Sequence, residues 1–272
     1  MNIVKYRNIF FAFSLMIIVP GIIALYVWGL KLGIDFAGGT LYEAHFQEQN
    51  PSAQDVQSFL IAQNFEVAST ATTTENSVLI RTKVSDEGTI NSLKAKLKEN
   101  FGQIEDIRQE TVGPTISGEL TNKAITAVAI SIVAIVIYVS WSFRKVPKPA
   151  SGLIFGVSTI AALLHDVIVT VGAFAVLGHF LHLEIDSLFI TALLTVLGFS
   201  VHDTIVVLDR IRENLKKYSD HSFEQIVNHS ILQTMTRSLN TSLTVVFVLV
   251  ALLLFGGQSI KSFVLALLIG IV

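Results

Sequence analysis

The stretch that decides the fold is residues 9–30, IFFAFSLMIIVPGIIALYVWGL, which contains no charged side chain. A helix needs about 20 mostly apolar residues to cross the hydrocarbon core of a bilayer, so this run is long enough for one membrane span. It is too long for the apolar core of a signal peptide, and no Ala-x-Ala type of cleavage pattern follows it. We therefore interpret residues 9–30 as a retained transmembrane helix.

Further apolar runs follow after one polar stretch. Four of them meet the same length criterion, at 124–143, 151–177, 187–208 and 238–255. A sixth run, 262–272, rises only about 16 Å as a helix, roughly half of the hydrocarbon thickness. The pattern predicts an α-helical multi-pass membrane bundle of six spans, with the last one truncated in this chain.

Composition agrees with this class and excludes others. Hydrophobic residues make up 51% of the 272 residues and charged residues only 15%, against about 25% in soluble domains. A net charge of −2 implies no general affinity for nucleic acid, and the absence of cysteine excludes disulfides and thiolate catalysis. His179 and His182 share a short loop but supply too few ligands for a metal. No nucleotide loop or serine triad is visible, so we expect neither an enzyme nor a cofactor.

Basic residues indicate the orientation of the spans. They gather before the first run and in alternate loops, at Lys5, Arg7, Arg144, Lys145, Lys148, Arg210, Arg212, Lys216 and Lys217. Short cytoplasmic loops carry an excess of Lys and Arg. The pattern predicts a cytoplasmic N-terminus, a first span at 1–30, an extracytoplasmic domain at 31–120, and spans two to six at 121–272.

The polar segment 31–120 has its own periodicity. Alternation of apolar and polar residues predicts strands, and apolar residues at helical spacing predict two helices. The predicted order is β-α-β-β-α-β, the ferredoxin-like arrangement of a small α+β domain, with a polar Thr-rich turn between the second and third strands. The predicted bounds are 40–47, 52–64, 65–70, 77–83, 86–101 and 103–112.

Short motifs recur along the chain in a recognisable order. They read GIDFAGGT at 33–40, VGPTISGEL at 112–120, LLHD at 163–166, GFSVHDTIVVLDRIREN at 198–214, TRSLNTS at 236–242 and LLLFGG at 252–257. Together they resemble the SecD/SecF family of the resistance-nodulation-division superfamily, and the small outer domain favours the SecF branch. Position 202 departs from the family pattern, because the chain has His where the family usually has Asn.

The resemblance implies a function. It predicts a SecF-like subunit of the SecDF complex, which uses the proton-motive force to promote protein export across the bacterial plasma (inner) membrane. The implied partners are a SecD-like subunit, a SecYEG-type translocon, unfolded preprotein, protons and membrane lipid, with no nucleic acid; sodium coupling stays open. Two alternatives remain: a proton-coupled exporter of small molecules or lipids from the same superfamily, and a non-transporting translocon assembly factor.

The strongest cases of charged side chains within or at the edge of the apolar runs are Asp166, Asp203 and Arg237. A charge inside a bilayer costs several kcal/mol, so each needs a reason. Either they are buried polar contacts between helices, or they form a proton pathway; the resemblance supports the second for Asp203 and Arg237. At 1.5 Å per residue these two lie about 25 and 28 Å from the outer ends of their helices, a similar depth that would suit an ion pair.

Two histidines and two glycines complete the candidate residues. His165 and His202 precede the two acids and could shuttle protons. Adjacent residues on a helix point about 100° apart, so neither histidine need face its neighbour. Gly38 and Gly39 lie at the junction between the first span and the outer domain, where they form either a tight turn or a hinge.

Overall fold

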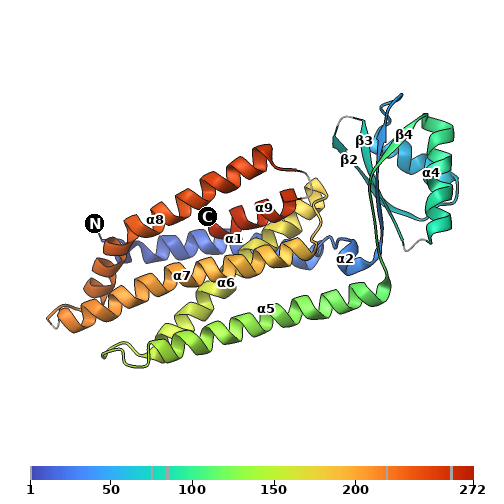
Figure 1. Ribbon diagram of the computed structural model, residues 1–272. Helices are drawn as coiled ribbons and strands as arrows, with labels where there is room; N and C mark the ends of the chain where they lie inside the picture. Colours follow the sequence, from blue (N-terminus) through green and yellow to red (C-terminus); the bar gives the residue numbers. More distant parts are fainter. Residues whose placement is uncertain (1, 75, 84–85, 219, 258–259) are drawn as a thin grey trace. The chain divides into compact units, whose positions relative to one another are not determined.

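The computed structural model describes the chain except for residues 1, 75, 84–85, 219 and 258–259 (Figure 1). The described residues separate into two compact units. The helical unit consists of residues 1–31 and 125–272, and the sheet unit consists of residues 32–124. Each unit is described by itself.

The sheet unit is a four-stranded antiparallel sheet in the order β2-β3-β1-β4. After the short helix α2, strands and helices follow in the order that the sequence predicts. Their bounds are α2 Ile34–Ala37, β1 Gly39–Phe46, α3 Ala53–Ala62, β2 Val67–Thr74, β3 Ser77–Thr82, α4 Glu87–Phe101 and β4 Ile104–Val112.

Alternation along β1 builds the core of the sheet unit. Tyr42, Ala44 and Phe46 are fully buried on one face, because every second side chain of a strand points the same way. Both helices cover this face, since their apolar residues join the same cluster. Its buried members are Tyr42, Ala44, Phe46, Val56, Leu60, Val78, Ile80, Leu93, Leu97, Phe101 and Ile104.

Polar side chains determine where the two helices of the sheet unit begin. The hydroxyl of Ser52 accepts a hydrogen bond from the backbone N–H of Asp55, and the Asp55 carboxylate accepts one from the Ser52 N–H. This capping box satisfies two backbone donors that have no partner within the helix. Asp86 caps α4 in a similar way by accepting from the N–H of Thr89.

The predicted Thr-rich turn between the second and third strands is wrong. Strand β2 continues to Thr74, so the threonines at 72–74 belong to the strand. Threonine is β-branched and fits a pleated edge strand. The Thr73 hydroxyl donates to Oε1 of Glu43 at 2.6 Å, and that of Thr70 donates to the Ala53 carbonyl at 2.8 Å, so the polar groups are satisfied inside the unit.

In the part of the chain that the structure describes, five helices are long and apolar enough to cross a membrane. They comprise α1 Arg7–Val27, which extends the short η1 Val4–Tyr6, together with α5 Pro114–Ser142, α6 Gly152–Leu181, α7 Ser187–Lys217 and α8 Phe223–Phe255. Of the predicted six spans, the structure supports these five. The remaining apolar run forms α9 Lys261–Ile271, a helix of 11 residues.

The spans extend beyond the predicted apolar runs because their polar ends are also helical. Helix α8 begins at Phe223 instead of 238, where Ser222 and Gln225 form a capping box. Buried Asn214 near the end of α7 donates to Ser230 Oγ at 2.8 Å and to Gln233 Oε1 at 3.0 Å on α8. These polar contacts hold the two long helices together outside their apolar segments.

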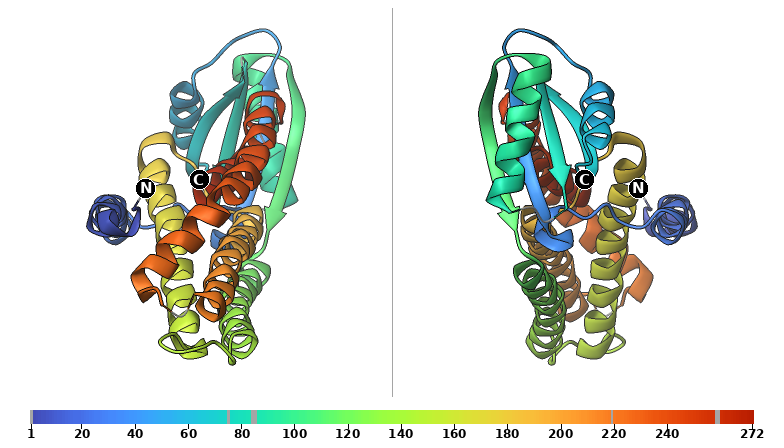
Figure 2. Two further views of the ribbon diagram at one scale, coloured as in Figure 1. Left: turned by 90° about the vertical axis from the view of Figure 1, so that its left-hand side faces the viewer. Right: turned by 90° about the vertical axis from the view of Figure 1, so that its right-hand side faces the viewer.

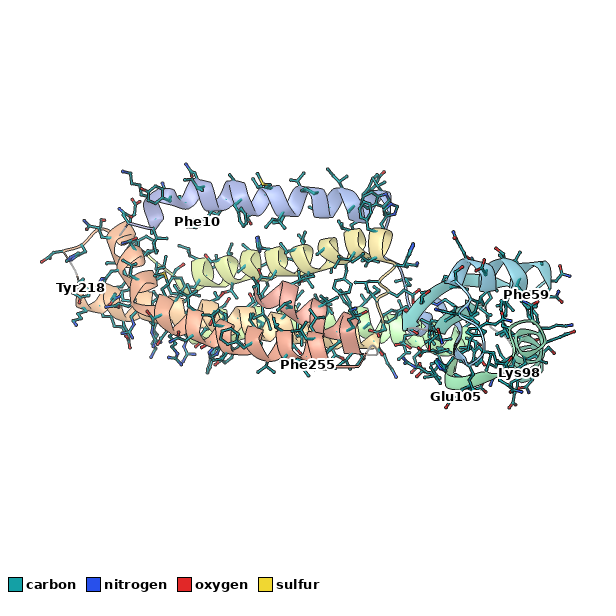
Figure 3. The ribbon with its side chains drawn as sticks, turned by 90° about the horizontal axis from the view of Figure 1, so that it is seen from above. Phe10, Phe59, Lys98, Glu105, Tyr218 and Phe255 are labelled. Carbon is teal, nitrogen blue, oxygen red and sulfur yellow. The ribbon has the colours of Figure 1, made fainter. Side chains whose placement is uncertain are left out.

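Helix α7 occupies the middle of the helical unit and α1 lies at its margin. Helix α7 packs against α6, α8 and α9, whereas α1 packs along α6 (Figure 2). In α1 only Gly21 and Ala24 are buried, and its large side chains, such as Phe10, are exposed along the helix (Figure 3).

Candidate functional site

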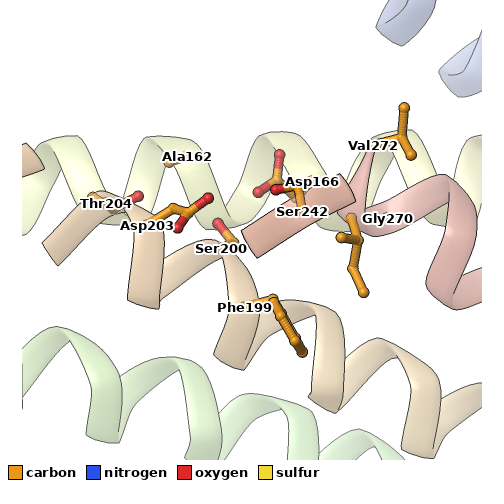
Figure 4. A pocket seen from close by; sticks show the side chains of 10 residues that line it. Ala162, Asp166, Phe199, Ser200, Asp203, Thr204, Ser242, Gly270 and Val272 are labelled. Carbon is orange, nitrogen blue, oxygen red and sulfur yellow. The ribbon is translucent and has the colours of Figure 1, made fainter. Parts of the chain in front are cut away.

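A pocket of about 260 Å³ lies inside the helical unit, among four helices. Two carboxylates line it, Asp166 from α6 and Asp203 from α7, together with the hydroxyl-bearing Ser200, Thr204 and Ser242 (Figure 4). Its other lining residues are Ala162, Phe199, Gly270, Ile271 and Val272. The volume suffices for water molecules, and a site with this many polar groups would hold them by hydrogen bonds.

Helical spacing brings the polar side chains to the pocket. On α7, Ser200, Asp203 and Thr204 are three and four residues apart and so share one face. The sequence predicts a proton pathway through both acids but does not place them in one cavity. The structure brings Asp166 and Asp203 together there and adds Ser242 of α8, which the sequence analysis did not single out.

Gly270 allows α9 to close one side of the pocket. A Cβ atom at this position would lie 2.4 Å from Cγ2 of Val196 and 2.9 Å from Oγ1 of Thr170. Because real Cβ atoms do not approach so closely, only glycine permits α9 to pack this near α6 and α7. The short apolar helix is therefore part of the site.

Asp166 has a hydrogen-bonded neighbour on its own helix. Nδ1 of His165 lies 2.8 Å from Oδ1 of Asp166, and Nε2 of the same ring contacts the Ser14 hydroxyl of α1. Adjacent helical residues point about 100° apart, yet these two side chains come within hydrogen-bond distance of each other. Ser14 was missed by the sequence analysis; a hydroxyl within a charge-free apolar run was the available signal.

Arg237 and His202 are placed differently from the acids. Both are exposed, and neither lines the pocket. Among the described residues no ion pair joins Arg237 to Asp203. The similar distances of Asp203 and Arg237 from the outer helix ends place them at a similar height in the bundle. Whether the two side chains meet depends on the rotation of each helix about its own axis.

Of three small residues close together on α7, two line the pocket and the third meets no neighbour. Ser200 and Thr204 belong to the pocket, whereas a Cβ at Gly198 would meet no atom within 4 Å. The close helix contacts occur elsewhere. A Cβ on Gly172 of α6 would lie 2.7 Å from the Cα of Gly21 on α1.

Gly38 and Gly39 form a turn that no other residue type adopts easily. Their φ angles are +72° and +127°, and a Cβ on Gly39 would lie 2.6 Å from the carbonyl oxygen of Thr82. Positive φ is strained for residues with a side chain. This geometry explains both glycines as the start of β1; the hinge stays a hypothesis.

Outside the membrane helices, two coupled groups have shifted pKa values. Burial, together with a hydrogen bond to Asp106, raises the pKa of the Tyr42 phenol well above its ordinary value. Burial also acts to raise the pKa of Asp106, but hydrogen bonds from Lys94 and Tyr42 outweigh it, and the net pKa lies below the ordinary value. Burial lowers the pKa of Arg81 to about 10. Within the described ranges no group of three His, Asp or Glu residues is arranged to hold a metal ion.

Five apolar helices, a polar pocket within their bundle and a small mixed domain define a multi-span membrane protein with ionisable groups among its spans. Two family patterns match the chain. "Protein export membrane protein SecD/SecF, C-terminal" covers residues 92–272, and "SecD/SecF GG Motif" covers residues 23–49. The chain therefore belongs to the SecD/SecF family of protein export membrane proteins.

Named relatives agree along the whole length. "Protein translocase subunit SecF" of Thermobaculum terrenum is 48% identical, over 100% of this chain and 88% of the relative. "Protein translocase subunit SecDF" of Bacillus subtilis is 40% identical over 98% of this chain but only 35% of its own length. A crystal structure of SecDF, a translocon-associated membrane protein from Thermus thermophilus, superimposes with a TM-score of 0.87 at 31% identity and covers 100% of this chain and 36% of that one.

Proposed function

We propose that this chain is a SecF-like subunit that uses the proton-motive force to promote protein export through a Sec-type translocon. The observation that carries the proposal is the pocket among the helices, which Asp166 and Asp203 line together from the adjacent helices α6 and α7. A carboxylate in a membrane interior is costly unless it has a function or a partner. Two titratable groups beside a polar cavity provide a place for a proton to bind and leave.

Arg237 enters the proposal as the moving partner of Asp203. A nearby guanidinium lowers the pKa of a carboxyl group, and its withdrawal lets the pKa rise. Arg237 is exposed on α8 in the present structure, away from the pocket. We assign it to a second state of the cycle, in which it approaches Asp203 and expels the proton.

The sheet unit is proposed to lie outside the cytoplasm and to act on the emerging preprotein. Its β-α-β-β-α-β order and antiparallel pairing support a ferredoxin-like assignment. One charge that crosses 100 mV yields about 2.3 kcal/mol. That energy shifts a two-state movement of the domain about fiftyfold, since every 1.4 kcal/mol is a factor of ten.

The test replaces the proton site and keeps its shape. Asp203→Asn removes the titratable proton, and we expect normal insertion but loss of proton flux and of proton-driven preprotein release in membrane vesicles. Asp209→Asn is the matched control, because Asp209 lies six residues further along α7, outside the pocket, in an ion pair with Arg212. Arg237→Lys should also be impaired, since a point charge does not reproduce a planar guanidinium. Wild-type flux and release in Asp203→Asn would refute the proposal.

The proposed partners can be tested independently of flux. A SecD-like subunit and a SecYEG-type translocon should co-purify with the chain in mild detergent. The exporter alternative predicts instead a small molecule or lipid whose efflux depends on Asp203. The assembly-factor alternative predicts co-purification without any dependence of export on the acids.

A further inference from the structure

The contact between α1 and α6 repeats along both helices at a constant offset. Ser14 meets His165, Gly21 meets Gly172, Trp28 meets His179, and Lys31 meets His182. Each pair is separated by 151 positions in the chain, and the first three pairs are spaced by seven residues. From Ser14 and His165 onward the two helices therefore run parallel in a heptad register, which keeps one seam in contact up to the ends of both helices.

Each level of this seam has a different chemistry. In the middle the two glycines bring the backbones almost into contact, which holds the helices without large side chains. At one end the indole of Trp28 stacks on the ring of His179 with centroids 4.2 Å apart. At the other end the polar link seen among the described residues is the hydroxyl of Ser14 on His165.

The Ser14 link continues into the pocket. His165 Nδ1 faces Asp166 Oδ1 at 2.8 Å, and Asp166 lines the pocket together with Asp203. Among the described residues, Asp203 of α7 is the one other ionisable side chain that lines the pocket: α8 contributes Ser242, and α9 contributes Gly270, Ile271 and Val272. Helix α1 has no charged residue from Asn8 to Leu30. A change in the protonation of Asp166 can therefore be transmitted to α1 through the imidazole ring of His165.

We propose that Ser14, His165 and Asp166 form a relay through which α1 responds to protonation of the pocket. This inference rests on the proposed proton-coupled function and adds Ser14 and His165 as positioning residues. Helix α1 is continuous in sequence with the sheet unit, which begins at Leu32. A change at the Ser14 end thus acts on the helix that precedes the domain.

The hydrogen-bond roles of the relay reverse when one proton is added. With the Asp166 carboxylate ionised, Nδ1–H of His165 donates to it, and Nε2 accepts from the Ser14 hydroxyl. In the loaded relay, which holds one more proton, the proton resides on the Asp–His pair and Nε2 carries a hydrogen. Ser14 then becomes the acceptor, and its own hydrogen must find another partner. The change occurs at the interface of α1 and α6, 14 positions before the Trp28 level.

The first experiment reads the imidazole directly and needs no transport. The full chain, labelled with ¹⁵N-histidine and reconstituted in lipid bilayers with its SecD-type partner, is measured over a pH series, and His165→Gln assigns the signal. We expect the Nδ1–H tautomer at high pH, protonation of Nε2 as pH falls, and the Nε2–H tautomer at high pH in Asp166→Ala. An Nε2–H tautomer in the wild type at high pH would overturn the relay.

The second experiment tests its consequence for transport. Ser14→Ala should lower proton flux about tenfold or more, the effect of one lost hydrogen bond to an ionisable group, and should shift its pH midpoint. Ser14→Thr keeps the hydroxyl and should restore both. Ser158→Ala is the control, because the Ser158 hydroxyl bonds only to the carbonyl of Ile154 within α6. Unchanged flux and midpoint in Ser14→Ala contradict the relay, whereas unchanged flux in Asp203→Asn contradicts the proposed function and leaves the tautomer experiment to decide the relay.

Discussion

Apolar side chains face inward in the sheet unit, whereas in the helical unit many of them face outward. Phe46 is fully buried in the sheet unit, while Phe10, Phe11 and Phe13 of α1 are 57%, 66% and 62% exposed. In water, burial of apolar area drives packing, so hydrophobic periodicity identifies the core. In lipid that driving force between helices is absent, and small residues and hydrogen bonds determine which helices meet. The two units therefore depend on different residues for their stability.

The largest effect should follow from a core substitution in the sheet unit. Residues 38–118 expressed without the spans should form a soluble monomer with mixed helix and strand signals, which makes the unit measurable. In it, Phe46→Ala should lower the free energy of unfolding by about 3–5 kcal/mol, because it leaves a cavity. Phe46 also loses its edge-to-face contact with Phe101, at a centroid distance of 5.6 Å. Chemical denaturation monitored by circular dichroism provides the measurement, and a disordered wild-type fragment would contradict the assignment.

The next effect concerns a residue with no apolar side chain at all. Gly172→Leu should separate α1 from α6, because even a Cβ there meets the Gly21 backbone. Overpacking typically costs about 1–3 kcal/mol. Gly198→Leu is the matched control on a helix of the same unit, since a Cβ there meets nothing within 4 Å. Thermal stability in detergent should fall for the first variant only; equal stability of the two would show that the glycine contact is incidental.

A smaller effect is expected at a helix cap of the sheet unit. Ser52→Ala removes the hydroxyl that accepts from the Asp55 N–H and should cost about 1 kcal/mol. Ser92→Ala is a control on α4, where the hydroxyl only bonds back to the Gly88 carbonyl. The urea unfolding midpoints of the two variants provide the measurement. If Ser52→Ala lowers the midpoint no more than Ser92→Ala does, the Ser52 cap does not stabilise the unit.

The smallest effect is a pH dependence. Because the pKa of Asp106 is lowered in the folded unit, this carboxylate contributes stability above its ordinary pKa of about 3.9, and the contribution is lost as pH falls. The pKa of Tyr42 is raised, so its contribution is present below about pH 10 and is lost as pH rises. Stability should therefore be greatest between these limits. Asp106→Asn should flatten the acid side of the urea midpoint profile, and an unchanged acid slope would contradict this.

The contrast between the units also explains what the sequence could predict. Alternation along 40–47 and helical spacing along 86–101 placed the elements of the sheet unit within a few residues, because one side of each faces water. The threonines at 72–74 misled, since their polarity indicates a turn while their branching suits a strand. In the helical unit, apolar length located five helices, and cost of charge singled out Asp166 and Asp203.

Partners among the helices could not be predicted in the same way. A uniformly apolar helix has no preferred side. The hydrophobic pattern therefore predicts neither the Gly21–Gly172 contact nor the packing of α9 against Val196. Similar depth suggested a contact of Asp203 with Arg237, yet the rotation of α8 leaves the arginine exposed. Ser14 became meaningful only when the structure placed it beside His165.

In the heptad seam, the glycine contact lies midway between the two other contacts of α1 with α6. The glycine contact lies seven residues from Ser14 and seven from Trp28, so the two arms are equal, each about 10 Å at 1.5 Å per residue. If α1 tilts as a rigid helix about the Gly21–Gly172 contact, the Ser14 level and the Trp28 level move by the same amount in opposite directions. Loosening at the serine would thus tighten the tryptophan stack, and tightening there would loosen it, with no gain or loss of amplitude between the ends.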